Sequence, residues 1–430
     1  MKGQHKVLIM RCDAYDPDRI SGIVREGMEE LGVTPSGKIL LKPNVVIAHP
    51  EVFPHAFTRK EFLEGVIVAT KAMAQDAEEI AVGERSGITL PTRYNFRNAG
   101  YPKVIRKHRV RTYYFDEEVH VPVEIERDGR LRNELLIPKP VTLQDVIKSD
   151  FIAIDGITAG QKMMLTPTPF SLGAIVMGTN SCAVDTVGCH MVHVDPGDLI
   201  HLGYAADRGH GPMDLDEIEV GGDFPLEEVR EKTWDFELCM ERVDDYFGEE
   251  SRLSCTVGTF PEKHSPDYCW GGCPGALQEA MHIFRGFDPN VDQEMGKVRY
   301  VVGKVDGPLD LEDDERVIFA GNCTSWKGVI DGKNVRIESS YKSSDARNGR
   351  KTRSNDMILK TLKTLWRCFR NRSARYIHAE GCTLSVAENV NYLSALGKIG
   401  NPNFHPRLLI PVNLAYWQMR AHRLLNRIFG

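Results

Sequence analysis

The stretch Lys38-Ile39-Leu40-Leu41-Lys42-Pro43-Asn44 decides how the amino-terminal half of the chain is interpreted. Its continuous apolar run is typical of a strand that is buried on both faces, as in parallel sheets. Helical patterns flank it over residues 16–31 and 59–75, and Thr58 is the expected N-cap of the second helix. A further strand is expected over residues 79–82. This alternation predicts an α/β fold, with a mostly parallel sheet flanked by helices in the amino-terminal half.

The pattern changes after this alternating region. Apolar residues alternate from Val119 to Ile125, the turn Asp128-Gly129 follows, and the pattern returns over residues 131–137, which predicts a β-hairpin. Buried strands are then expected over residues 151–156 and 173–178, and helices over residues 183–194 and 198–208.

The spacing of these segments predicts three regions. They are an α/β domain over residues 1–222, a smaller cysteine-bearing α/β domain over residues 223–342, and a basic helical tail over residues 343–430. Helices are expected in the tail over residues 356–369, 386–396 and 413–429. If the tail supplies a metal ligand, it folds back on the cysteine-bearing domain. Its apolar residues would then be core contacts: Leu359, Leu362, Leu365, Trp366 and Phe369.

Four cysteines of the second half share one local setting, with a glycine within two residues: Cys269, Cys273, Cys323 and Cys382. Glycine lets the backbone approach an inorganic centre and turn its amides toward sulfur. We therefore expect the four thiolates to converge on one iron–sulfur cluster, with 4Fe–4S as the first choice. The alternative is that they are buried or loop cysteines without a metal.

The number of ligands separates three functions. Four cysteines close the cluster and favour an oxidoreductase or an electron-transfer component. If only Cys269, Cys273 and Cys323 bind, an open iron allows Lewis-acid chemistry and a hydro-lyase. A non-catalytic scaffold with structural zinc is the third reading, although the distant, isolated ligands fit compact zinc sites less well.

Polar residues follow several of the predicted strands, where ligands bind in open α/β sheets. Lys42, Asn44 and Asp155 are the candidate residues for a small anionic substrate. Glu84 and Asp185 are candidate acid–base or cation-binding carboxylates. We expect all five side chains to face one cleft.

Composition and charge limit the class of protein. With 42% hydrophobic and 27% charged residues, the chain is typical of globular proteins. No export signal and no apolar run suited to a membrane span are visible, so a cytoplasmic location with reduced thiols is expected. A small anionic substrate, a redox partner protein and a homodimer are the partners considered.

The charge is unevenly distributed. Residues 342–430 carry 16 Lys and Arg against 4 Asp and Glu, although the net charge of the whole chain is −6. Such a segment suits nucleic acid, an anionic membrane or an acidic partner. We prefer the interpretation that this basic segment packs on the acidic remainder of the chain and that the protein does not bind nucleic acid.

Several of these segments together resemble the domain-of-unknown-function family 362. The matching segments are Lys38–Asn44, Gly83-Glu84, Phe96–Tyr101, Asp155-Gly156-Ile157, Gly178–Asp185, Leu202–Gly211 and Ile218–Gly222. The likeness covers roughly residues 6–222, and the segment Gly381–Glu388 also resembles a cysteine-bearing element of longer members.

The resemblance implies an association with iron–sulfur centres and redox metabolism, without a settled reaction. The chain also departs from the family. A Lys-Thr-His stretch and a Lys-Asn-Gly-like segment found in many members are missing before Phe151, and the ferredoxin-like run of closely spaced cysteines is absent.

Overall fold

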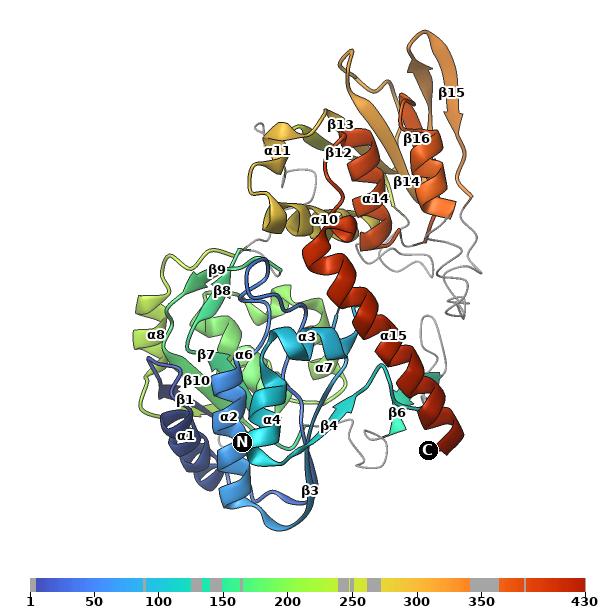
Figure 1. The fold of residues 1–430 in the computed structure, drawn as a ribbon. Helices are drawn as coiled ribbons and strands as arrows, with labels where there is room; N and C mark the ends of the chain where they lie inside the picture. Colours follow the sequence, from blue (N-terminus) through green and yellow to red (C-terminus); the bar gives the residue numbers. More distant parts are fainter. Residues whose placement is uncertain are drawn as a thin grey trace. The chain divides into compact units, whose positions relative to one another are not determined.

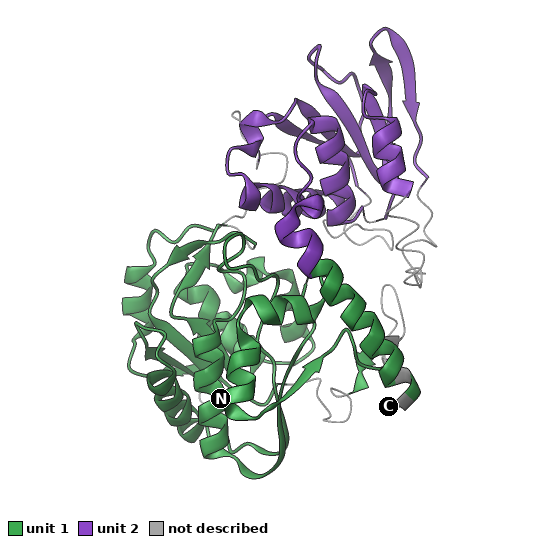
Figure 2. Ribbon diagram, in the orientation of Figure 1, with its two compact units in different colours: residues 1–121, 137–239, 412–430 green, residues 122–136, 240–411 purple. Residues whose placement is uncertain are grey.

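The computed structural model describes residues 5–87, 90–124, 134–139, 149–162, 165–238, 247, 251–260, 272–340, 363–382 and 384–429. The chain forms two compact units (Figure 2). Unit 1 comprises Met1–Val121, Ile137–Cys239 and Val412–Gly430, and unit 2 comprises Pro122–Leu136 and Met240–Pro411. The units therefore do not break at residues 222 and 342. Most of the last helix belongs to unit 1, from Val412 on, although it follows unit 2 along the chain.

The first sheet of unit 1 has the strand order β11-β1-β10-β7. Its strands are β1 (His5–Arg11), β7 (Ile152–Gly156), β10 (Ala174–Gly178) and β11 (Ile218–Gly221). β1 is antiparallel to β10 and parallel to β11, and β10 is antiparallel to β7. The prediction of a mostly parallel sheet is therefore wrong for this sheet, which is mixed.

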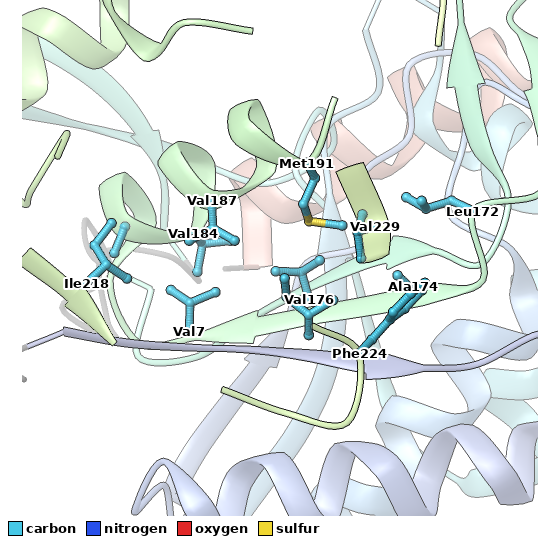
Figure 3. Packing of buried hydrophobic residues seen from close by; sticks show 12 residues of the cluster. Val7, Leu172, Ala174, Val176, Val184, Val187, Met191, Ile218, Phe224 and Val229 are labelled. Carbon is cyan, nitrogen blue, oxygen red and sulfur yellow. The ribbon is translucent and has the colours of Figure 1, made fainter. Parts of the chain in front are cut away.

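Apolar side chains of β1 point alternately to the two faces of this sheet. Val7 and Ile9 pack on one face against α6 (Ser181–Met191), in the core drawn in Figure 3. Leu8 and Met10 point to the other face, where they join side chains of α1 (Pro17–Glu30) and α2 (Lys60–Met73). Burial of each such aliphatic side chain contributes about 1.5–3 kcal/mol.

The second sheet of unit 1 is parallel, with the order β2-β3-β4. Its strands are β2 (Ser36–Leu41), β3 (Gln75–Glu84) and β4 (Arg111–Tyr114). α2 packs on this sheet through Leu63 and Ile67 and on the first sheet through Phe62 and Ala69. One helix with two apolar faces therefore joins the two sheets. Figure 1 shows α2 beside α1.

The ends of α1 and α2 differ in how they are capped. Asp16 caps α1, accepting a hydrogen bond from the Asp18 N–H at 2.9 Å, and Gly32 follows the helix with φ +67°. The prediction that Thr58 is the N-cap of α2 was wrong. Arg59 occupies that position, and the Thr58 hydroxyl instead donates to the Asn44 carbonyl at 3.2 Å.

The remaining elements of unit 1 include two helices that the sequence did not predict, α4 and α8. The helices are α3 (Thr92–Asn98), α4 (Tyr101–His108), α7 (Ile200–Asp207) and α8 (Leu226–Lys232), with 3-10 turns η1 (Pro196–Asp198) and η2 (Leu215–Glu217). A small antiparallel pair is formed by β8 (Ala159–Gln161) and β9 (Thr168–Phe170). The expected strand pair is present as β5 (His120–Glu124) and β6 (Glu134–Pro138), and each of these strands is divided between the two units.

Unit 2 is built on four parallel strands in the order β12-β13-β14-β16. They are β12 (Leu253–Val257), β13 (Val298–Lys304), β14 (Arg316–Ile330) and β16 (Tyr376–Ala379). The second half of β14 forms a hairpin with β15 (Lys333–Ile337). α10 (Gly272–Phe287) and α14 (Val386–Gly397) pack together (Figure 1), and α11 (Val291–Glu294) and η3 (Pro402–Phe404) also belong to the unit.

The first tail helix does not bury the side chains that were expected in a core. Residues 363–370 are helical, but Trp366 and Phe369 are 59% and 80% exposed. The buried side chains are Thr364 and Cys368, on the other face of that helix. Leu365 is half-buried, and Leu359 and Leu362 lie outside the described residues.

The last helix, α15 (Pro406–Phe429), begins earlier than predicted and contains Pro411. Among helices formed by the described residues, none has the length and hydropathy needed to cross a bilayer.

Candidate functional site

The cysteine segments of unit 2 meet at one edge of its parallel sheet. Ala320 of β14 pairs with Ala379 of β16, so the residues after both positions emerge side by side. The Asn322 N–H donates to the Gly381 carbonyl at 3.0 Å and joins the two segments. Cys323 and Cys382 are thereby brought to the same edge from positions far apart in sequence.

Two sulfur atoms face the same glycine. A Cβ built on Gly321 would lie 3.0 Å from the Cys273 Sγ and 3.9 Å from the Cys323 Sγ. Gly321 has φ +90°, a backbone conformation that favours glycine. The Leu384 N–H points at the same place, with its nitrogen 3.5 Å from the Cys273 Sγ. The start of α10, the middle of β14 and the segment before α14 therefore converge on two thiols.

The predicted ligands differ in burial. Cys273 is buried, Cys323 is half-buried, Cys382 is exposed, and Cys269 lies outside the described residues. Within the described part of the chain, no set of three or more His, Cys, Asp or Glu side chains is arranged to hold a metal ion. The structure thus brings Cys273 and Cys323 together and places the Cys382 segment beside them. A shared glycine and an amide directed at sulfur fit the chemistry of a thiolate-bound cluster.

Sequence reasoning missed one thiol near this place. Cys255 of β12 is paired in register with Tyr300 of β13. Burial raises the pKa of Tyr300, and the nearby Cys273, Cys255 and Cys323 raise it further. The Tyr300 hydroxyl donates to the Asn389 Oδ1 at 3.1 Å. Cys255 has no glycine within two residues, so the pattern used for the other cysteines could not find it.

A second candidate site is a cleft within unit 1, with a volume of about 1460 Å³. Side chains of β2, α2 and β7 line it, including Leu41, Phe62 and Ile154. Within the described residues, β2 pairs only with β3 and β7 only with β10, so both are edge strands. The interpretation of β2 as a strand buried on both faces was wrong, because Ile39, Leu40 and Leu41 are only half-buried and line the cleft.

Three of the predicted site residues line this cleft: Lys42, Asn44 and Asp155. Asn44 and Asp155 are connected through the start of α2. The Thr58 N–H donates to the Asn44 carbonyl at 2.9 Å, and the next backbone N–H, that of Arg59, donates to the Asp155 carboxylate. The ends of β2 and β7 are held at one helix N-terminus, which favours anions.

Asp155 is surrounded by donors and by protein. The Tyr15 hydroxyl donates to its Oδ1 at 2.9 Å, and backbone N–H groups of Arg59 and Ile157 also donate. Burial nevertheless raises the pKa of Asp155 to about 6. The Arg59 guanidinium lies 4.7 Å from the centre of the Tyr15 ring. Tyr15 and Arg59 also line the cleft, and Tyr15 carried no recognisable signal in the sequence.

Glu84 lies behind Lys42. Its Oε2 is 2.6 Å from the Lys42 Nζ, and its Oε1 accepts from the Arg85 N–H at 2.6 Å. Burial raises the pKa of Glu84, and Lys42 opposes that change. The Glu84 side chain is 7% exposed and that of Lys42 57%, so the ammonium group reaches toward solvent from a buried carboxylate.

Asp185 does not join this group. It lies on α6 and is not among the residues that line the cleft. Its neighbours include Cys182, Cys189 and His201, and burial raises the pKa of Asp185. Three of the five predicted polar residues therefore line the cleft. Glu84 contacts one of them, Lys42, and Asp185 lies elsewhere in unit 1.

Comparison with known proteins identifies a family for part of the chain. No curated protein and no solved structure matches the sequence. Residues 39–147, which include the end of β2 and all of α2, β3 and β4, match the family described as Domain of unknown function (DUF362). The resemblance to this family is therefore confirmed for residues 39–147.

Proposed function

We propose that unit 2 holds an iron–sulfur cluster, with 4Fe–4S as the first choice, and that the chain acts as an oxidoreductase or electron-transfer component. The observation that carries this proposal is the convergence of the Cys273 and Cys323 sulfur atoms on Gly321. Cys269 and Cys382 are the other proposed ligands.

The local backbone supports a thiolate centre. Gly321 leaves open the space that a side chain would take beside both sulfur atoms. The Leu384 N–H directed at the Cys273 Sγ stabilises negative charge on sulfur and holds the side chain in place. When bound, the cluster would supply reversible one-electron transfer.

The cleft of unit 1 is the proposed site for a small anionic substrate. Lys42 presents its ammonium group there, and Arg59 and the start of α2 add positive charge. Asn44 offers an amide for orientation. Asp155, with its pKa of about 6, can hold or release a proton near neutral pH, and Glu84 keeps Lys42 in position.

The exposure of Cys382 favours a second candidate. If only Cys269, Cys273 and Cys323 bind, the cluster keeps an iron open to substrate, and a hydro-lyase becomes the better description. A scaffold with structural zinc remains the third candidate, separated from the others by the metal itself.

Anaerobic purification followed by metal and sulfide analysis tests the proposal. Iron with acid-labile sulfide and a broad absorbance at about 400 nm is the expected result. Cys273→Ala and Cys323→Ala should each lower the iron content. Cys368→Ala, which changes another buried thiol of unit 2, should not. Zinc alone, or iron content that does not respond to Cys273→Ala, would show that the cluster assignment is incorrect.

A further inference from the structure

The last helix presents two unlike faces. On one face, Ala415 and Met419 are buried, and the Asn426 side chain donates to the Glu117 carbonyl at 3.2 Å within unit 1. On the other face of the part of α15 that follows Pro411, four large apolar side chains are more than half exposed: Leu414 (52%), Trp417 (64%), Leu424 (60%) and Ile428 (60%). Their spacing of three, seven and four residues places them in one stripe along α15.

The charge of α15 is of one sign. The helix contains Arg407, Arg420, Arg423 and Arg427 and no Asp or Glu. The Arg420 guanidinium carbon lies 5.9 Å from the Trp417 ring centre and 5.8 Å from that of Tyr416, so positive charge borders the apolar stripe. Tryptophan next to arginine is the combination found where a protein meets the headgroup region of a membrane.

A second helix repeats this pattern in unit 2. Residues 363–370 expose Trp366 and Phe369, and the Arg370 guanidinium carbon lies 5.1 Å from the Trp366 ring centre. An exposed aromatic residue beside arginine therefore occurs twice in the basic part of the chain. This recurrence is independent of the packing of α15.

We propose that α15 binds the surface of an anionic membrane, with Leu414, Trp417, Leu424 and Ile428 entering the headgroup boundary. An apolar stripe bordered by arginines suits this surface, where apolar burial and attraction to anionic lipids act together. A second copy fits less well, because pairing two α15 helices would bring arginines together without acidic partners. Nucleic acid offers no apolar surface that would cover the leucine and isoleucine side chains.

Co-flotation of the full chain with vesicles tests the proposal. Vesicles of phosphatidylcholine mixed with phosphatidylserine should carry the protein, whereas phosphatidylcholine alone should carry little, and added salt should weaken the binding. Trp417→Gln with Leu424→Gln should abolish flotation. Arg420→Gln should weaken it about fivefold.

The matched control is Trp234→Gln, which changes a tryptophan of unit 1 outside α15 that is 78% exposed. It should float like the parent chain, and circular dichroism should show all variants folded. Flotation that survives the α15 changes would overturn the proposal. The proposal would also be overturned if the parent chain does not float with vesicles and the α15 changes instead abolish a dimer seen by sedimentation, or abolish oligonucleotide binding.

Discussion

Gly321→Ala is the sharpest test of the cysteine site, because the chain offers a matched glycine. Gly321 and Gly332 have φ values of +90° and +74°. A Cβ in this region costs about 1–2 kcal/mol at either position. At Gly332 the new methyl group meets nothing within 4 Å, whereas at Gly321 it lies 3.0 Å from the Cys273 Sγ. Ordinary contacts begin at 3.4 Å, so that sulfur must move by a few tenths of an ångström.

A shift of that size exceeds the tolerance of about 0.2 Å in metal–ligand distances. Gly321→Ala should therefore lose most of its iron and acid-labile sulfide, while Gly332→Ala should keep both. Urea denaturation of the metal-free full chain should show a backbone penalty of about 1–2 kcal/mol in each variant. Equal iron content in the two variants would refute the reasoning, because only Gly321 touches the thiols.

Three further predictions concern single side chains. Cys382→Ala should lower cluster occupancy or make one iron labile; unchanged iron content and absorbance would favour three-thiolate ligation. Because Asp155 has a pKa of about 6 rather than 3.8, its protonated form stabilises the fold at low pH. Relative to Asp155→Asn, that stabilisation should be lost as the pH rises from about 4 through about 6, by about 3 kcal/mol at most. Urea titrations at several pH values measure this, and parallel curves would contradict it. Lys42→Met should leave the buried Glu84 without its cation and destabilise unit 1 by about 1 kcal/mol; Glu84→Gln in the same background should recover the loss.

The sequence by itself determined most of the local elements. Apolar runs predicted β7 and β10, and the apolar periodicity over residues 16–31 predicted α1, because each of these depends on residues that are close in sequence. The family resemblance also came from short segments, and it was confirmed over residues 39–147. The glycine rule selected Cys273 and Cys323, whose sulfur atoms share the space beside Gly321.

Pairing and solvent exposure were decided only by the tertiary structure. A continuous apolar strand is compatible with a buried centre or with an edge beside a cleft, and the neighbours of β2 made it an edge. The strand direction was also decided by long-range pairing, because β1 is antiparallel to β10, which lies far along the chain. Cys255 lies near Cys273 and Cys323 because β12 pairs with β13 in the register that sets Cys255 opposite Tyr300. Asp185 does not line the cleft, because α6 packs on the face of the first sheet that carries Val7 and Ile9. The local sequence indicates which side chains are apolar enough to be buried. The elements that cover them come from distant parts of the chain, so only the tertiary structure shows which they are.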